Sequence, residues 1–337
     1  MVLFAHAPDW ADGNLSRELL ARILHSQYTT QYTLGSLGVD GFFLLSGFLI
    51  VGSWRSDPEF LNYLRKRVLR IVPGYLVAML ISTIAVGILA PGISHFFRHL
   101  NRHYWESLLI LDGPITPPVF PGGHVTGVNM PVWTIPYEFR CYLVVAFWGI
   151  LGLFRRPVLW VVATAVLLFL VVFPALTGPA ESWHALYYLT GQPPQIARLG
   201  AAFFVGGSFS LFRGRIPFRP WFAAISVAVV IAVGAFASAQ FEPAVLVFGG
   251  YLLFFLGQAK GVRLDWMKHV PDISYGVYLY GGPVEALWIW YHAGGSPWMT
   301  ALASVLICYP LGWLSWHMVE RPMLQLKRRA SAALPPP

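Results

Sequence analysis

Nine long apolar stretches, separated by shorter polar connections, constrain the fold of this sequence more than any other feature. A helix needs about 20 predominantly apolar residues to cross the hydrocarbon core of a bilayer. Only 11% of the residues are charged and 56% are hydrophobic, whereas soluble domains carry about 25% charged residues. The stretches are therefore predicted to be membrane-spanning helices. They are Val39–Trp54, Ile71–Ala90, Val132–Phe154, Val158–Pro174, Ala197–Phe212, Trp221–Ala239, Ala244–Gly257, Ile273–Tyr291 and Pro297–Val319.

The amino terminus is predicted to be the end of one further helix. Met1–Ala7 is apolar as far as His6, and so short a segment cannot cross about 30 Å of hydrocarbon. We therefore expect an all-α, polytopic membrane protein with about ten transmembrane helices, the first of them truncated at the N-terminus. The charged segment and full apolar core of a cleavable signal peptide are not visible in the sequence.

The distribution of positive charge predicts the orientation of these helices. Cytoplasmic connections carry an excess of lysine and arginine, and one alternating set of connections holds most of the 23 such residues. That side, which includes the C-terminus, is predicted to be cytoplasmic, so the net charge of +8 requires no nucleic-acid partner. The residues concerned are Arg55, Arg65, Lys66, Arg67, Arg70, Arg155, Arg156, Arg213, Arg215, Arg219, Lys260, Arg263, Lys268, Arg321, Lys327, Arg328 and Arg329.

An acidic residue, Glu138, lies inside one of the apolar stretches. It is about two turns into the predicted helix Val132–Phe154, which begins shortly after Asn129 and contains Trp133. Placing an ionisable group at membrane depth costs roughly 2.5–3.5 kcal/mol on insertion scales, which makes such a residue a candidate for function. The alternative is that Glu138 pairs with an arginine and only holds two helices together.

His6 is a second ionisable residue in the outer half of the predicted helices. Imidazole titrates near neutral pH, so it can remove a proton from a hydroxyl and return one to a leaving group. A carboxylate beside a histidine fixes its tautomer and stabilises the imidazolium. Because Glu138 is predicted at a similar depth, the two residues form a candidate catalytic pair. The alternative is an interfacial histidine without a role.

A basic cluster, Arg65-Lys-Arg67-Val-Leu-Arg70, lies at the predicted cytoplasmic end of a helix. Arg67 and Arg70 are three residues apart and so share one helical face. Guanidinium groups bind phosphate through two parallel hydrogen bonds. The cluster is a candidate phosphate site, although basic residues at this end of a helix are also an ordinary topology signal.

Two other polar features admit a structural and a functional interpretation. Asp40 is an acid near the outer membrane edge, within a stretch whose Ser46 and Gly47 favour close helix packing. The three histidines of the second feature recur every four residues, a spacing that permits metal binding. The surrounding sequence is more typical of an amphipathic helix at the membrane interface, so we expect no metal. These histidines are His95, His99 and His103.

Five motifs occur along the chain. They are Gly38–Ile50, Arg67-x-x-Arg70-Ile-x-Pro73-x-Tyr75, Asn129-x3-Trp133-Thr-x3-Glu138, Ile273-Ser-Tyr-Gly-Val-Tyr-Leu279 and Glu320-Arg-Pro322. In type and order they resemble the acyltransferase 3 family of bacterial membrane O-acyltransferases, and the resemblance covers nearly the whole chain. It implies transfer of an acyl group, usually acetyl from acetyl-CoA, to hydroxyls of cell-surface glycans, including lipopolysaccharide and exopolysaccharide.

The resemblance also implies roles for particular residues. His6 matches the family's essential histidine of the first helix, and Arg67 and Arg70 match its arginine pair. The family places an arginine or lysine eleven residues before that histidine, a position that here falls before Met1. Tyr280–Pro283 also departs from the histidine or tryptophan that many members have there.

Together these observations predict a single transmembrane acyltransferase domain over residues 1–325 and a short basic, Ala/Pro-rich cytoplasmic tail over 326–337. The location is the bacterial cytoplasmic (inner) membrane, where the chain is multi-pass, and the oligomeric state is left open. The partners expected are the lipid bilayer and a carbohydrate or glycolipid acceptor, with acyl-CoA as co-substrate. A proton-coupled glycan or lipid transporter or flippase and a non-catalytic membrane scaffold are the alternatives.

The expected site has three parts. His6 is a general base or a transient acyl carrier, and Glu138 orients it. The coenzyme and the acceptor are expected to contact the basic cluster and the outer entrance, respectively. The coenzyme residues are Arg65, Arg67 and Arg70, and the acceptor residues are Asn129, Trp133, Asp40, Tyr275 and Ser274.

Overall fold

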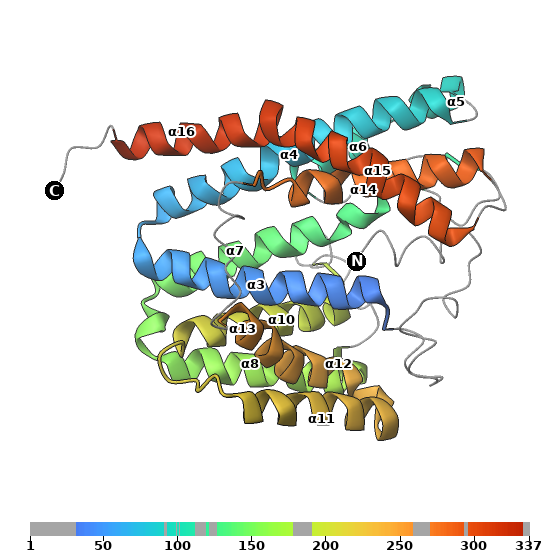
Figure 1. Ribbon diagram of the computed structural model, residues 1–337. Helices are drawn as coiled ribbons and strands as arrows, with labels where there is room; N and C mark the ends of the chain where they lie inside the picture. The colour runs from blue at the N-terminus through green and yellow to red at the C-terminus, as the bar shows by residue number, and fades with distance from the viewer. Residues whose placement is uncertain are drawn as a thin grey trace. The chain divides into compact units, whose positions relative to one another are not determined.

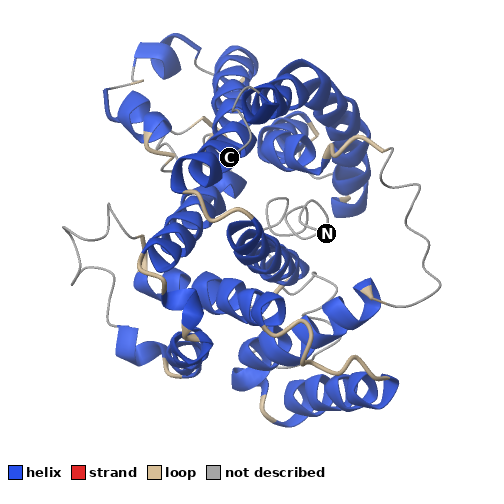
Figure 2. Cartoon of the chain, turned by 90° about the vertical axis from the view of Figure 1, so that its left-hand side faces the viewer, coloured by secondary structure: helices blue, strands red, loops and turns tan. Residues whose placement is uncertain are grey.

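The computed structural model describes residues 32–90, 93–98, 100, 102–111, 119–120, 127–177, 191–258, 270–292 and 296–332. Within these ranges the chain forms helices joined by turns, and no strand occurs (Figures 1 and 2). This confirms the all-α prediction for the described part of the chain.

Every predicted span coincides with a helix or with consecutive helical segments. Proline favours the first turn of a helix, where its missing N–H is not needed, and α8, α10, α11 and α15 each begin with one. The longer helices are α3 (Leu34–Ser56), α4 (Phe60–Leu89), α7 (Ile135–Ile150), α8 (Pro157–Val172), α10 (Pro193–Leu211), α11 (Pro220–Phe236), α14 (Ser274–Tyr291), α15 (Pro297–Ser315) and α16 (Arg321–Ala332). The shorter segments are α5 (Ile93–Arg98), α6 (Arg102–Leu109), η3 (Met130–Thr134), η4 (Leu153–Arg155), η5 (Pro174–Thr177), η7 (Ser238–Gln240), α12 (Phe241–Ala244), η8 (Val245–Gly249), α13 (Gly250–Gly257) and η10 (Trp316–Glu320).

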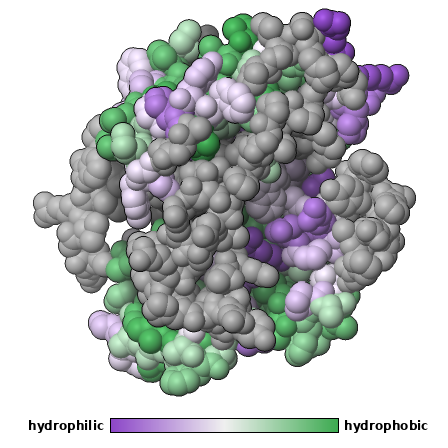
Figure 3. Space-filling model, turned by 90° about the vertical axis from the view of Figure 1, so that its right-hand side faces the viewer, coloured by the Kyte–Doolittle hydropathy of each residue, from purple (hydrophilic) through white to green (hydrophobic). Residues whose placement is uncertain are grey.

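Three of the described helical segments are long and apolar enough to cross a membrane: Leu34–Ser56, Phe60–Leu89 and Pro297–Leu326. Three further helices are apolar but shorter: Pro157–Val172, Pro220–Phe236 and Phe241–Gly257. Large apolar side chains such as Leu49 and Phe236 are exposed, and hydrophobic residues (green) reach the surface in Figure 3. These features indicate a membrane protein, while the ten-helix topology stays a prediction.

The chain divides into two compact units. Unit 1 contains the described residues of Leu64–Pro136 and of Trp266–Pro337, and unit 2 those of Leu19–Tyr63 and of Tyr137–Asp265. Most of α4 and all of η3, α14, α15 and α16 therefore belong to unit 1. Unit 2 holds α3, most of α7, and α8 to α13. Helix α16 continues into the predicted tail as far as Ala332.

Unit 2 is organised around direct backbone contact between α3 and α10. A Cβ added at Gly47 would lie 1.9 Å from the carbonyl oxygen of Phe203, and one at Gly206 would lie 1.9 Å from that of Leu44. No side chain fits at either position, so the two glycines let the helices touch. The close packing expected from Gly47 is confirmed.

Unit 1 contains a similar approach between α14 and α15. A Cβ at Gly276 would lie 2.8 Å from Cα of Gly312. Helix α14 also contains Pro283, which has no N–H to donate to the carbonyl of Leu279, four residues earlier. The side chain of Asn129 supplies the missing donor, since its Nδ2 lies 2.8 Å from the Leu279 oxygen. The segment before η3 thus completes the backbone hydrogen bonds of α14.

Candidate functional site

The predicted catalytic pair is described only in part. His6 lies outside the described residues. Glu138, in the first turn of α7, is 7% exposed and accepts a short hydrogen bond from the hydroxyl of Tyr142, one turn later. Ser46 of α3 donates in turn to the Tyr142 hydroxyl over 3.5 Å. Within unit 2, Glu138 is therefore a buried carboxylate held by a tyrosine of its own helix.

The arginines predicted to bind the coenzyme lie in different environments within unit 1. Arg70 Nη2 is 2.6 Å from Oδ2 of Asp272, and Nη1 is 3.8 Å from Oε2 of Glu320. Arg65 is exposed and donates to the carbonyl oxygen of Leu326 over 3.1 Å. Arg67 is partly buried on the same helix. The charge of Arg70 is thus offset by two carboxylates, which reduces its availability to a phosphate group.

Two of the residues expected at the acceptor, Ser274 and Tyr275, lie beside Arg70. The hydroxyl of Ser274 donates to Oδ1 of Asp272 over 2.6 Å. The Tyr275 hydroxyl donates to the carbonyl oxygen of Ile71 over 2.9 Å, and Arg70 lies 5.7 Å from the centre of its ring. Both residues therefore fix the start of α14 to α4 and belong with the basic cluster.

The carboxyl of Asp272 has a perturbed affinity for protons. Burial raises its pKa, but the hydrogen bonds from Ser274 and the charge of Arg70 outweigh burial and hold the pKa below its ordinary value. Asp272 consequently stays ionised at neutral pH and remains paired with Arg70. Glu320, which is 2% exposed, is held as well by a 3.0 Å hydrogen bond from Ser315.

The residues expected at the outer entrance are Asn129 and Trp133. Asn129 is buried, and its amide donates to Leu279, so part of its role is structural. Its Oδ1 has no hydrogen-bond partner within the described ranges. Trp133 is partly buried on η3, beside Thr134, whose hydroxyl lies 2.6 Å from that of Tyr278. The structure thus groups these residues around the middle of α14.

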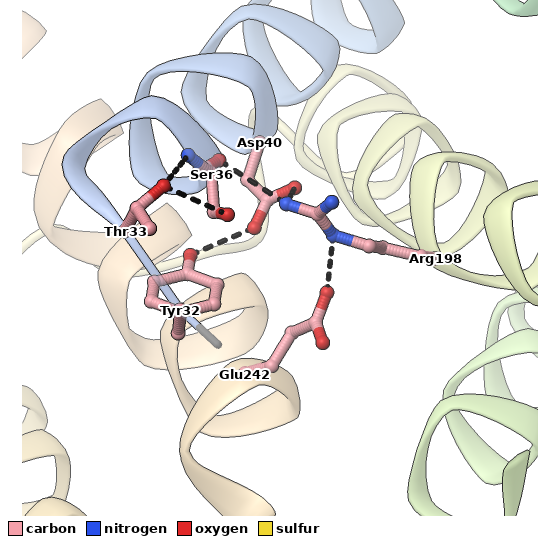
Figure 4. Close-up of polar contacts among 6 residues, drawn as sticks. All are labelled: Tyr32, Thr33, Ser36, Asp40, Arg198 and Glu242. Atoms are coloured by element: carbon pink, nitrogen blue, oxygen red, sulfur yellow. Dashed lines mark hydrogen bonds and ion pairs between the residues drawn. The ribbon is translucent and has the colours of Figure 1, made fainter. Parts of the chain in front are cut away.

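Asp40 belongs to a cluster that the sequence alone does not reveal (Figure 4). Its Oδ2 accepts a 2.7 Å hydrogen bond from the hydroxyl of Tyr32, and its Oδ1 lies 3.1 Å from Nη2 of Arg198. The Nε of Arg198 forms a close ion pair with Glu242. Asp40 is fully buried and Arg198 is 17% exposed. We call these four residues the Arg198 cluster.

A cavity of about 550 Å³ borders the Arg198 cluster. Its polar lining comes from Tyr32 and Ser36 at the start of α3, and from Gln195 and Arg198 near the start of α10. Glu242 at the start of α12 completes this side, and the ends of α8 and η7 add apolar and amide groups. All these elements belong to unit 2. Pockets of this size typically accommodate small organic ligands.

Four charged residues with evident structural or chemical importance were not predicted as site residues. Arg198 and Glu285 lie inside predicted spans, so the signal that identifies Glu138, a charge within an apolar segment, applies to them as well. Glu242 and Glu320 lie just outside the predicted spans. Glu285 in α14 is a further fully buried carboxylate. The four residues are Arg198, Glu242, Glu285 and Glu320.

The described residues contain no group of three or more histidine, cysteine, aspartate or glutamate side chains that could hold a metal ion. Of the three evenly spaced histidines, His95 lies in α5, which ends at Arg98, and His103 lies in α6, which begins at Arg102, while His99 lies outside the described residues.

Comparison with known proteins gives a consistent set of similarities. The family profile described as an acyltransferase domain matches residues 1–317. An O-acetyl transferase of Shigella phage Sf6 is 26% identical over 86% of this chain and 85% of its own length. Acyltransferase MdmB of Streptomyces mycarofaciens is 26% identical over 90% and 85% of the two chains. Exopolysaccharide production protein ExoZ of Rhizobium meliloti (strain 1021) is 28% identical over 90% and 94%. No solved structure matches significantly.

Proposed function

Since this chain belongs to the acyltransferase 3 family and is an acyltransferase, we propose that it transfers an acyl group from acyl-CoA to a hydroxyl of an exported glycan or glycolipid. The observation that carries the proposal is the family match over residues 1–317, which includes four of the five motifs, the fifth, Glu320-Arg-Pro322, lying just beyond it. The similarity to an O-acetyl transferase favours acetyl as the acyl group. The similarity to an exopolysaccharide production protein favours a polysaccharide as the acceptor.

The proposed reaction joins an alcohol to a thioester. The acceptor oxygen attacks the thioester carbonyl carbon, the carbon–sulfur bond breaks, and an ester and free coenzyme A result. His6 removes the hydroxyl proton and returns a proton to the departing sulfur. Glu138 stabilises the imidazolium that forms between these two steps. The burial of Glu138 and its hydrogen bond from Tyr142 support a fixed orientation of this carboxylate.

The basic cluster has two functions in this proposal. Arg67 and the exposed Arg65 contact the coenzyme phosphates. Arg70 has a positioning role, because its pairing with Asp272 and Glu320 links α4 to the start of α14 and to η10. The arginine pair of the motif would therefore divide into one phosphate ligand and one structural residue.

The chain is proposed to reside in the bacterial cytoplasmic membrane with its C-terminus in the cytoplasm. The excess of lysine and arginine on one set of connections supports this orientation. It would place the basic cluster where acyl-CoA is made, and the opposite ends of the helices would face the exported acceptor.

Transfer from radiolabelled acetyl-CoA by the purified protein in lipid nanodiscs tests the function. The unsubstituted protein should consume the thioester and label a surface-polysaccharide fraction. His6→Ala and Glu138→Gln should each reduce transfer at least a hundredfold, a typical contribution of general acid–base catalysis. Glu106→Gln, which removes a charge from an exposed ion pair on α6, is the matched control and should retain full activity.

The same assay separates the proposal from its alternatives. Full transfer by well-folded His6→Ala and Glu138→Gln would overturn the assignment of the catalytic pair. Proton-coupled movement of glycan without any thioester consumption would identify a transporter instead.

A further inference from the structure

The cavity beside the Arg198 cluster is a polar pocket among the described residues that the proposed reaction steps do not use. Its lining includes a carboxylate, a guanidinium, an amide and two hydroxyl groups, from Glu242, Arg198, Gln195, Tyr32 and Ser36. These groups come from the starts of three helices of unit 2, so the cavity lies at one end of those helices. By the charge distribution this is the end opposite the basic connections.

The charges of the cluster restrict the kind of ligand. Arg198 carries one positive charge, and Asp40 and Glu242 carry one negative charge each when ionised, so the ionised cluster is negative overall. Arg198 Nη2 and Nε are occupied by Asp40 and Glu242, as Figure 4 shows. A phosphate or carboxylate ligand would meet an excess of negative charge, which disfavours the coenzyme as occupant.

The remaining groups suit a neutral ligand with several hydroxyls. Glu242 is 29% exposed, so its carboxylate is accessible to accept hydrogen bonds from hydroxyl groups. Oε1 of Gln195 is buried without a hydrogen-bond partner in the described structure, and an unsatisfied buried acceptor costs about 1–3 kcal/mol. The rings of Tyr32 and Phe241, 5.4 Å apart and nearly perpendicular, provide an apolar wall. Sugars combine these polar and apolar surfaces.

We propose that this cavity binds a neutral sugar residue of the acceptor glycan, with Glu242 and Gln195 accepting hydrogen bonds from its hydroxyls. Arg198 positions Glu242 through their ion pair and keeps Asp40 neutralised. The inference rests on the proposed transfer to a glycan and adds the class of ligand and the residues that select it. A dedicated subsite for the acceptor would let the enzyme hold a long polymer during transfer.

Photolabelling tests the location directly. The probes are diazirine derivatives of methyl glucoside, methyl galactoside and methyl rhamnoside, with a glucuronic acid derivative as the anionic comparison, all applied to the full chain in nanodiscs. At least one neutral probe should label peptides containing Tyr32–Asp40 or Glu242, and an excess of the matching methyl glycoside should prevent it. The glucuronic acid probe should label these peptides at least threefold less.

Kinetics with that same glycoside as acceptor test the residues. Glu242→Gln should raise the acceptor KM about tenfold, as expected for weakening a charge-assisted hydrogen bond. The kcat, the KM for acetyl-CoA and the thioester hydrolysis without acceptor should stay within twofold, which also shows that the variant is folded. Gln195→Leu should act in the same direction, and Glu106→Gln should change none of these values.

Two results would overturn the sugar site. One is labelling that no glycoside prevents or that lies outside the cavity peptides. The other is an unchanged acceptor KM in both cavity variants, or an equal rise in the KM for acetyl-CoA. If the unsubstituted protein consumes thioester but fails these tests, only the subsite is wrong. If it consumes none, the proposed function itself fails.

Discussion

Two regions of the molecule place one arginine between two carboxylates, yet their surroundings differ. In unit 1, Arg70 pairs with Asp272 and Glu320, and its side chain is 29% exposed and that of Asp272 50% exposed. In unit 2, Arg198 pairs with the fully buried Asp40 and with Glu242. In the first arrangement solvent screens the Arg70–Asp272 pair, although Glu320 is buried, whereas the second arrangement borders a cavity and burial strengthens its charges. The same residue types therefore hold helices together in unit 1 and, by our proposal, help to bind a sugar in unit 2.

Removing Arg198 is expected to cause the largest loss of stability. Arg198→Met leaves the carboxylate of Asp40 buried with only Tyr32 as a partner, and such a break typically costs about 3–5 kcal/mol. Unfolding titrations with SDS in mixed micelles would measure the loss. The double variant Arg198→Met/Asp40→Asn should recover at least half of it. Arg102→Met, which breaks an exposed ion pair on α6, is the comparison. If Arg198→Met loses no more stability than Arg102→Met, burial does not strengthen the ion pairs of Arg198.

Removing an uncharged hydrogen bond in unit 1 should cause an intermediate loss of stability. Asn129→Ala removes the donor to the Leu279 carbonyl, and an unsatisfied buried acceptor costs about 1–3 kcal/mol. In the Pro283→Ala background the helix can use its own backbone N–H, so the same substitution should cost less than half as much. Equal costs in both backgrounds, measured by the same titration, would refute the link between Asn129 and Pro283.

Removing Arg70 should cost less than removing Arg198, about 1–2 kcal/mol. Its pair with Asp272 is partly exposed, and exposed pairs contribute about 0–1 kcal/mol. Glu320 is buried, but it lies 3.8 Å from Arg70, farther than Asp40 lies from Arg198, and it keeps its hydrogen bond from Ser315. Arg70→Met should also reduce kcat more than it raises the KM for acetyl-CoA, because a positioning residue does not bind the phosphates. A selective rise in that KM would instead make Arg70 a coenzyme ligand, as first predicted.

The pH dependence of the Arg70–Asp272 pair should give the smallest effect. The pKa of Asp272 is lowered in the folded chain, so the pair stabilises the protein above the unfolded pKa of about 3.9. This stabilisation is lost as the pH falls through the lower, folded pKa. Asp272→Asn should therefore be less stable than the parent at pH 7, by at most about 1 kcal/mol, and the difference should vanish once the pH lies below the lowered pKa of Asp272 in the folded chain. A stability difference that persists at all acidic pH values would contradict the lowered pKa of Asp272.

The helices were predictable from sequence, whereas the long-range contacts were not. Apolar runs bounded by prolines such as Pro157 and Pro297 indicate where helices begin, and helices occur at both places. Arg198 and Asp40 are 158 positions apart, and their meeting depends on which helices pack together. A single sequence with apolar faces all around its helices carries little information on that order. The role of Asn129 could not be predicted for the same reason, because its partner Leu279 is 150 positions away and their contact depends on how the helices pack.

The glycines at positions 47 and 206 have a mechanical consequence. Because each abuts a carbonyl of the opposing helix with no side chain between them, a shift of α3 along α10 by even one residue would drive a Cβ into the backbone. The two helices are thereby fixed in register and should move together as one rigid body. A conformational change that admits a substrate to unit 2 should therefore involve the segments that flank α3 and α10.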